Sequence, residues 1–157
     1  MYCTNIKKLR LLHEKKQSDV ALSLGCLRAR YSMWESGLVM IPLEFADKLA
    51  LLYNVKLAYI LGVEKNMSSN QYNVPMDYNV VLERLNSLKE ENHNSYEEIA
   101  LYLNCNRSTC YRYFKGIIKL PVDRLILICR LYEVDVDWLC GKKNEIVSTK
   151  TKTNNRI

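Results

Sequence analysis

The stretch NRSTCYRYFKG, residues 106–116, returns in altered form as LRARYSMWESG at residues 27–37. Both stretches have an arginine in second place, a bulky apolar residue in eighth place and a glycine at the end. This arrangement is typical of a short helix that ends at a glycine. One chain of 157 residues therefore carries the same local pattern twice.

The similarity extends well beyond these two stretches. Residues 17–62 align with residues 96–141 without a gap when the sequence is shifted by 79 positions. Because glycine, proline and apolar positions all keep their register, we expect two copies of one helical module. The period exceeds that of most stacked repeats, so two separate domains are expected. Identities include Ala21/Ala100, Leu24/Leu103, Cys26/Cys105, Arg28/Arg107, Gly37/Gly116, Pro42/Pro121, Leu52/Leu131, Tyr53/Tyr132, Val55/Val134 and Gly62/Gly141.

The predicted fold class is all-α, with two tandem five-helix domains joined by a short linker. The chain is 48% apolar and has only five glycines and three prolines, which disfavours a turn-rich β fold. A helical spacing of apolar residues marks the first helix of each domain. These residues are Ile6, Leu9 and Leu12 in copy one and Leu82, Leu85 and Leu88 in copy two.

Helix caps are clearest in copy two. The sequence SYEE predicts a capping box in which Ser95 and Glu98 start the second helix. Asn106 is a good N-cap for the third helix, and Pro121 is expected in the first turn of the fourth. Asp135 is expected to cap a short fifth helix.

Composition divides the chain into four parts: a first domain at 1–63, a polar linker at 64–76, a second domain at 77–142 and a disordered basic tail at 143–157. The net charge is +6, and the excess of basic residues lies in the first domain and from Lys142 onward. This distribution suggests a polyanionic partner.

Several other classes of function are disfavoured. The six cysteines form no CxxC pair and there are only two histidines, so no metal or other cofactor is expected. Free cysteines fit a reduced cytoplasm. The sequence shows neither a signal peptide nor an apolar run long enough for a membrane span. It has no glycine-rich phosphate loop and no recognisable nucleophile setting, so we do not expect an enzyme.

The second and third helices of each copy are joined by a few residues only, and Ala21 or Ala100 allows the two helices to cross closely. Such a pair presents its third helix outward, with a width that suits the DNA major groove. With these features the sequence resembles the helix-turn-helix domains of the Cro and lambda-repressor type, over nearly all of residues 4–65 and 77–142. This resemblance implies double-stranded DNA as the partner.

The resemblance also implies which residues contact DNA. The third helix enters the major groove, where arginine can pair with guanine and serine or threonine can contact several bases. Gln17 matches a glutamine that often contacts phosphate, and Lys115 and Lys119 could neutralise further phosphates. The expected reading residues are Arg28, Ala29, Arg30, Ser32 and Met33 in copy one and Arg107, Ser108, Thr109, Tyr111 and Arg112 in copy two.

Plainer interpretations stand beside these roles. Taken singly, Arg28 and Arg107 could be solvated helix residues, and Tyr111 and Met33 could be incidental surface residues. Tyr31, Trp34, Cys110 and Tyr113 lie at inward positions and are expected in the core. The copies also depart from the family pattern: Tyr96 replaces the glutamine and Phe114 a common glutamate in copy two, whereas Leu27 removes the usual cap in copy one.

Two functions remain open from the sequence. The first is a sequence-specific transcriptional regulator, expected to be a repressor of bacterial or phage origin, in which one chain supplies both heads or forms a homodimer. Because the third helices differ, the first hypothesis predicts an asymmetric DNA site. The second is a protein-interaction module, such as an antitoxin or antirepressor, because copy two is net acidic outside its third helix and places Glu97 and Glu98 near the expected phosphates.

Overall fold

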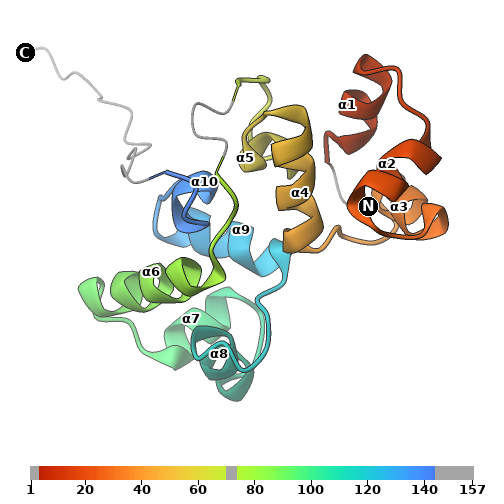
Figure 1. Ribbon diagram of the computed structural model, residues 1–157. Helices are drawn as coiled ribbons and strands as arrows, with labels where there is room; N and C mark the ends of the chain where they lie inside the picture. Colours follow the sequence, from red (N-terminus) through yellow and green to blue (C-terminus); the bar gives the residue numbers. More distant parts are fainter. Residues whose placement is uncertain (1–3, 70–73, 144–157) are drawn as a thin grey trace, which may run out of the picture.

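The computed structural model describes residues 4–69 and 74–143 (Figure 1). Over these ranges the chain is helical and has no strand, only one isolated bridge between Val55 and Ser69. The predicted all-α class and the two tandem helical domains are confirmed. Within the same ranges, no helix is both long and apolar enough to cross a membrane.

Within the described residues each copy contains five helices, as predicted. Those of copy one are α1 (Ile6–Leu12), α2 (Gln17–Leu24), α3 (Arg28–Glu35), α4 (Leu43–Tyr53) and α5 (Leu57–Ile60). Those of copy two are α6 (Tyr78–Glu91), α7 (Tyr96–Tyr102), α8 (Arg107–Phe114), α9 (Val122–Leu131) and α10 (Val136–Leu139). In Figure 1, α3 and α8 lie at outer parts of the molecule, whereas α5 and α10 lie toward its middle.

The predicted caps of copy two are present. The Ser95 hydroxyl accepts from the Glu98 N–H at 3.2 Å, and the Glu98 carboxylate accepts from the Ser95 N–H at 2.7 Å. The Asn106 side chain accepts from the Thr109 N–H at 2.7 Å, whereas Leu27 gives α3 no side-chain cap. Pro121 stands just before α9 as its N-cap residue, so the prediction that it lies in the first turn was wrong by one position.

The glycine that ends each motif adopts a left-handed conformation, with φ of 74° at Gly37 and 67° at Gly116. Residues with a Cβ rarely adopt this conformation, and it ends the helix. A Cβ at Gly116 would also lie 2.7 Å from the Leu82 side chain. The glycine therefore both ends α8 and allows the chain to pass closely over α6.

The side chains on the inner face of the third helix form the core of each domain. Tyr31, Trp34, Cys110 and Tyr113 are buried, as predicted. Ala21 and Ala100 are buried at the crossing of the second and third helices. Leu12 is different: it is 59% exposed, because α1 ends at this residue and packs through Ile6 and Leu9.

The two copies also contact each other. Helix α10 packs against α5, and the Asp137 carboxylate accepts hydrogen bonds from two backbone N–H groups of α5. The charge pattern groups Lys142 with the basic tail, but its side chain is fully buried and pairs with Asp47 of α4. Lys143 pairs with Asp135 at 3.0 Å. The rest of the predicted tail, residues 144–157, lies outside the described residues.

The unequal caps of α3 and α8 give a testable prediction. Asn106→Ala should lower the free energy of unfolding by about 1 kcal/mol, because the Thr109 N–H loses its acceptor. Leu27→Asn should raise it by up to about 1 kcal/mol, because the backbone at Leu27 already has the extended conformation of an N-cap and its side chain is 75% exposed. Urea unfolding of both variants measures these changes, and a change of the same sign at the two sites would contradict the assignment.

Candidate DNA-binding surface

The outer face of each third helix carries the predicted reading residues. Arg28, Ala29, Arg30 and Met33 are exposed on α3, and Ser32 is partly buried. On α8, Thr109 is partly buried, and its backbone N–H donates to the Asn106 cap; the remaining predicted residues are exposed. One shallow hollow collects Asn106, Arg107, Ser108, Thr109, Tyr111 and Arg112. The structure thus brings the predicted residues of α8 together on one accessible face.

In copy one, a polar network ties α3 to α1 and α2. Glu35 accepts from Arg10 through both carboxylate oxygens, at 2.8 and 2.7 Å, and from the Gln17 side chain at 3.3 Å. Burial alone would raise the pKa of Glu35, but the hydrogen bonds from Arg10 and Gln17 outweigh it and lower the pKa. Gln17, predicted to contact phosphate, is therefore oriented by the carboxylate at the end of α3.

In copy two, the three matching positions hold Lys89, Tyr96 and Phe114. The Tyr96 ring packs edge-on against Phe114 at 5.8 Å between ring centroids, and the Lys89 ammonium lies 4.6 Å from the centre of the Tyr96 ring. Phe114 is 1% exposed. The two departures from the family pattern therefore compensate each other, because an aromatic pair replaces a hydrogen-bonded one at the same crossing.

The first turn of the second helix differs in charge between the copies. In copy one, a shallow hollow at the start of α2 is lined by Arg10, Lys16, Gln17, Ser18 and Arg28. Its side chains are neutral or basic, a composition that suits a phosphate group.

Copy two has Glu97 at the position of Ser18. Its carboxylate pairs with Arg107 at 2.6 Å, and both side chains are largely exposed. Neither this pairing nor the hollow of copy one follows from the sequence patterns, which place Glu97 only near the expected phosphates. The shift of 79 residues, which places Glu97 on Ser18, marks this carboxylate as a charge that copy one lacks.

Two further residues that were predicted to contact DNA interact with other side chains of the protein. Tyr111 packs edge-on against Tyr96 at 5.4 Å between centroids, and the Lys115 ammonium lies 5.7 Å from the centre of the Tyr111 ring. Tyr111 is therefore a positioned side chain that stays 43% exposed. Lys119 follows the end of α8 in the chain and forms an ion pair with Glu44 of copy one at 2.9 Å.

The cysteines of the described ranges are unpaired, and those ranges contain no cluster of side chains that could hold a metal ion. Cys26 and Cys105 are partly buried at the turn between the second and third helices. Burial raises the pKa of Cys110 to about 11 and that of Cys129 to about 12. A thiol with so high a pKa is a poor nucleophile at neutral pH, so these residues act as small apolar side chains.

Two adjoining helices with a tight turn and an outward, arginine-bearing third helix define a helix-turn-helix protein. The sequence profile of the helix-turn-helix family matches the chain twice, over residues 6–60 and 85–139. The chain belongs to this family, and the resemblance to domains of the Cro and lambda-repressor type is confirmed in both copies.

A protein of Bacillus subtilis is similar to part of the chain. The chain is 33% identical over 63 residues to the uncharacterized HTH-type transcriptional regulator YobD of Bacillus subtilis strain 168. The aligned region is 40% of this chain and 56% of that protein, so the match spans little more than half of the relative. No solved structure matches the chain.

The network around Glu35 predicts a response to pH. Because the folded-state pKa of Glu35 lies below its ordinary value of 4.5, its stabilisation is fully present above pH 4.5 and is lost as the pH falls through the folded-state value. Glu35→Gln should lower the free energy of unfolding by about 2 kcal/mol at neutral pH and weaken its fall on acidification. Urea unfolding between pH 7 and 3 measures both effects. Glu91→Gln, a change at an exposed position on α6, is the control and should leave the free energy of unfolding at neutral pH unchanged.

Proposed function

We propose that this protein is a sequence-specific DNA-binding transcriptional regulator that uses both helix-turn-helix heads of one chain. The observation that carries the proposal is the repeated outward third helix, with exposed Arg28 and Arg30 on α3 and exposed Arg107 and Arg112 on α8. Membership of the helix-turn-helix family and the relative named as a transcriptional regulator support it. In this proposal the arginines read base edges in the major groove, where a bidentate pair with guanine discriminates most strongly.

Copy one supplies the stronger phosphate clamp in this proposal. Gln17 is held by Glu35, and Lys16 and Arg28 lie beside it in the same hollow. In copy two, Arg107 already forms an ion pair with Glu97, so a phosphate must displace the Glu97 carboxylate to bind there. Lys115 remains exposed near α8, whereas contact by Lys119 would require it to leave Glu44. The two heads should thus contribute unequally to affinity and read different half-sites.

The regulator is proposed to act as a repressor that covers its operator and excludes other proteins from it. We further propose a cytoplasmic location, which agrees with the unpaired cysteines of the described residues. Binding rather than catalysis is the function that these surfaces support, because the residues gathered on α3 and α8 are of the types that recognise DNA.

The direct test is selection from a random double-stranded DNA pool by the full-length protein at several salt concentrations, followed by sequencing of the bound fraction. A regulator should enrich a non-palindromic motif, with affinity that falls steeply as salt rises. A strict palindrome would instead indicate two copies of one head from a homodimer. Absence of any enriched motif would refute the proposal.

Charge reversal identifies the reading heads. Arg28→Glu with Arg30→Glu, and separately Arg107→Glu with Arg112→Glu, should each weaken binding to the selected site at least about 10-fold, because each lost guanine pair costs about 1–3 kcal/mol. Fluorescence anisotropy measures the affinities. If only the α3 variant loses binding, copy two does not read DNA.

The matched control for net charge is the double variant Lys65→Glu with Arg130→Glu. Both positions are exposed and lie outside α3 and α8. This control changes the net charge by the same amount as each test variant, so it should weaken binding much less. An equal loss in the control would mean that the test variants report overall charge and not base reading.

The ion pair between Glu97 and Arg107 in copy two predicts a substitution that tightens DNA binding. Glu97→Ser introduces the residue that copy one has at this position, and it should tighten DNA binding several-fold and steepen its salt dependence, because Arg107 becomes available to phosphate. The mirror change, Ser18→Glu, should weaken binding by copy one in the same assay. Unchanged affinity in both variants would show that the first turn of the second helix lies away from the DNA.

A further inference from the structure

The junction between the two copies is formed by matching surfaces. Helix α5 packs against α10, and these are equivalent elements of the repeat. The start of α4 and the start of α9 are also equivalent, and both line one apolar groove of about 250 Å³. A surface that meets its own equivalent forms an isologous contact, the kind that symmetric homodimers use. Here the contact is made within one chain.

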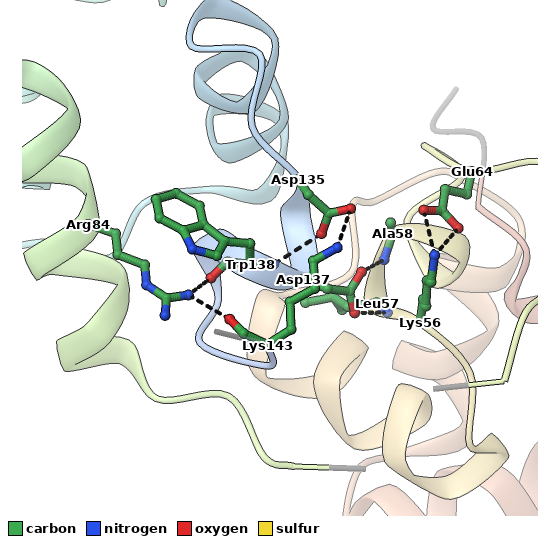
Figure 2. A network of polar contacts seen from close by, with 9 residues as sticks. All are labelled: Lys56, Leu57, Ala58, Glu64, Arg84, Asp135, Asp137, Trp138 and Lys143. Carbon is green, nitrogen blue, oxygen red and sulfur yellow. Dashed lines mark hydrogen bonds and ion pairs between the residues drawn. The ribbon is translucent and has the colours of Figure 1, made fainter. Parts of the chain in front are cut away.

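In the first polar contact between the copies, a side chain of copy two caps helix α5 of copy one. Asp137 is 2% exposed, and its carboxylate accepts from the Leu57 N–H at 2.8 Å and the Ala58 N–H at 3.0 Å (Figure 2). Helix α5 has no side-chain cap of its own, whereas α10 is capped by Asp135. Ala58 occupies the position in copy one that matches Asp137, so it cannot return the contact.

The second contact is a buried ion pair. The Lys142 ammonium bonds to the Asp47 carboxylate and donates to the Val74 carbonyl at 2.8 Å. Asp47 also accepts from the Met76 N–H at 3.0 Å. The matching positions in the repeat are Ile126 for Asp47 and Val63 for Lys142.

The third contact repeats this pattern at the surface. Lys119 of copy two pairs with Glu44 of copy one, whereas Met40, at the position that matches Lys119, carries no charge. All three contacts are therefore one-sided. Each joins a group of copy one to a group of copy two, but when the two copies exchange roles, the matching positions lack at least one of the two partners.

We propose that these one-sided charges form a pairing code that makes copy one bind copy two and prevents either copy from binding itself. In a pair of two first copies, each Asp47 would face Val63 and each α5 would lose its cap. In a pair of two second copies, each Lys142 would face Ile126, and the two Asp137 carboxylates would meet across the junction. Unpaired buried charges strongly disfavour both arrangements, so only the mixed pair is satisfied.

This proposal extends the two-headed regulator of the previous section, because it fixes which heads are placed side by side. The code keeps α3 and α8 in one mutual orientation and favours a monomer with two unlike heads over a homodimer through this surface. It differs from tethering by the linker alone, which would leave the relative orientation free.

The test uses two full-length variants with complementary charges. Asp47→Lys gives its chain two ammonium groups in the junction, and Lys142→Asp gives its chain two carboxylates there, so neither chain should close its own junction. When the two variants are mixed, each junction between chains joins one ammonium group to one carboxylate. Sedimentation velocity should show a 1:1 dimer only in the mixture, and circular dichroism should show that both variants keep their helical content.

A second variant tests the proposal if either charge substitution unfolds the protein. In the combination Asp47→Ile, Asp137→Ala and Lys142→Val, each residue becomes the one that the other copy has at the same position. The buried part of the code is then erased and only the surface pair of Lys119 with Glu44 remains, so the chain should self-associate at concentrations where the native protein is monomeric. The proposal is overturned if the charge variants do not dimerise on mixing, or if the erased-code variant stays monomeric. Neither measurement involves DNA, so failure of the DNA-binding proposal would be seen separately.

Discussion

The contact on which the arrangement of this molecule depends is the Asp137 carboxylate at the start of α5. A four-residue helix cannot satisfy its first N–H groups internally, and α5 has no cap of its own. Copy one therefore obtains these hydrogen bonds from copy two. Because the carboxylate is buried, it must keep both bonds or bear the free-energy penalty of desolvation, and this couples the position of α10 closely to that of α5.

The two copies show how one fold diverges by linked substitutions. Copy one ties its third helix to the first two through Arg10, Gln17 and Glu35, with hydrogen bonds between charged and polar groups. Copy two uses Tyr96 and Phe114 at the same crossing, with ring packing instead. A glutamate alone at position 114 would bury a charge without an arginine and a glutamine to receive it. These positions therefore have to change together, and the outward face of α8 can diverge without disturbing the core.

Much of the fold and the outward face of α3 could be predicted because their determinants are local. The cap at Asn106 acts over three residues, and the inward position of Trp34 follows from helical spacing. Helical spacing in the sequence cannot predict contacts between residues that are far apart in the chain. Lys142 is next to a basic segment in the sequence, yet its side chain is buried against Asp47, 95 residues away. Glu97 suggests an acidic surface, whereas its carboxylate pairs with the arginine at the start of α8. Comparing the copies marks such charges as lacking a counterpart, but only the structure shows which groups they meet.

A fixed pair of heads and a loosely tethered pair differ in the half-site separations that they can bind in an operator. Two heads on a free tether can adapt to several half-site separations, but each binding event must order the second head. Heads held by a buried junction have already lost that freedom, so they bind a matching separation more tightly and discriminate against all others. If the proposed regulator works through such a junction, its specificity is set by α3, by α8 and by the distance between them. Residues that never approach DNA, Asp47, Asp137 and Lys142, then belong to the determinants of operator choice.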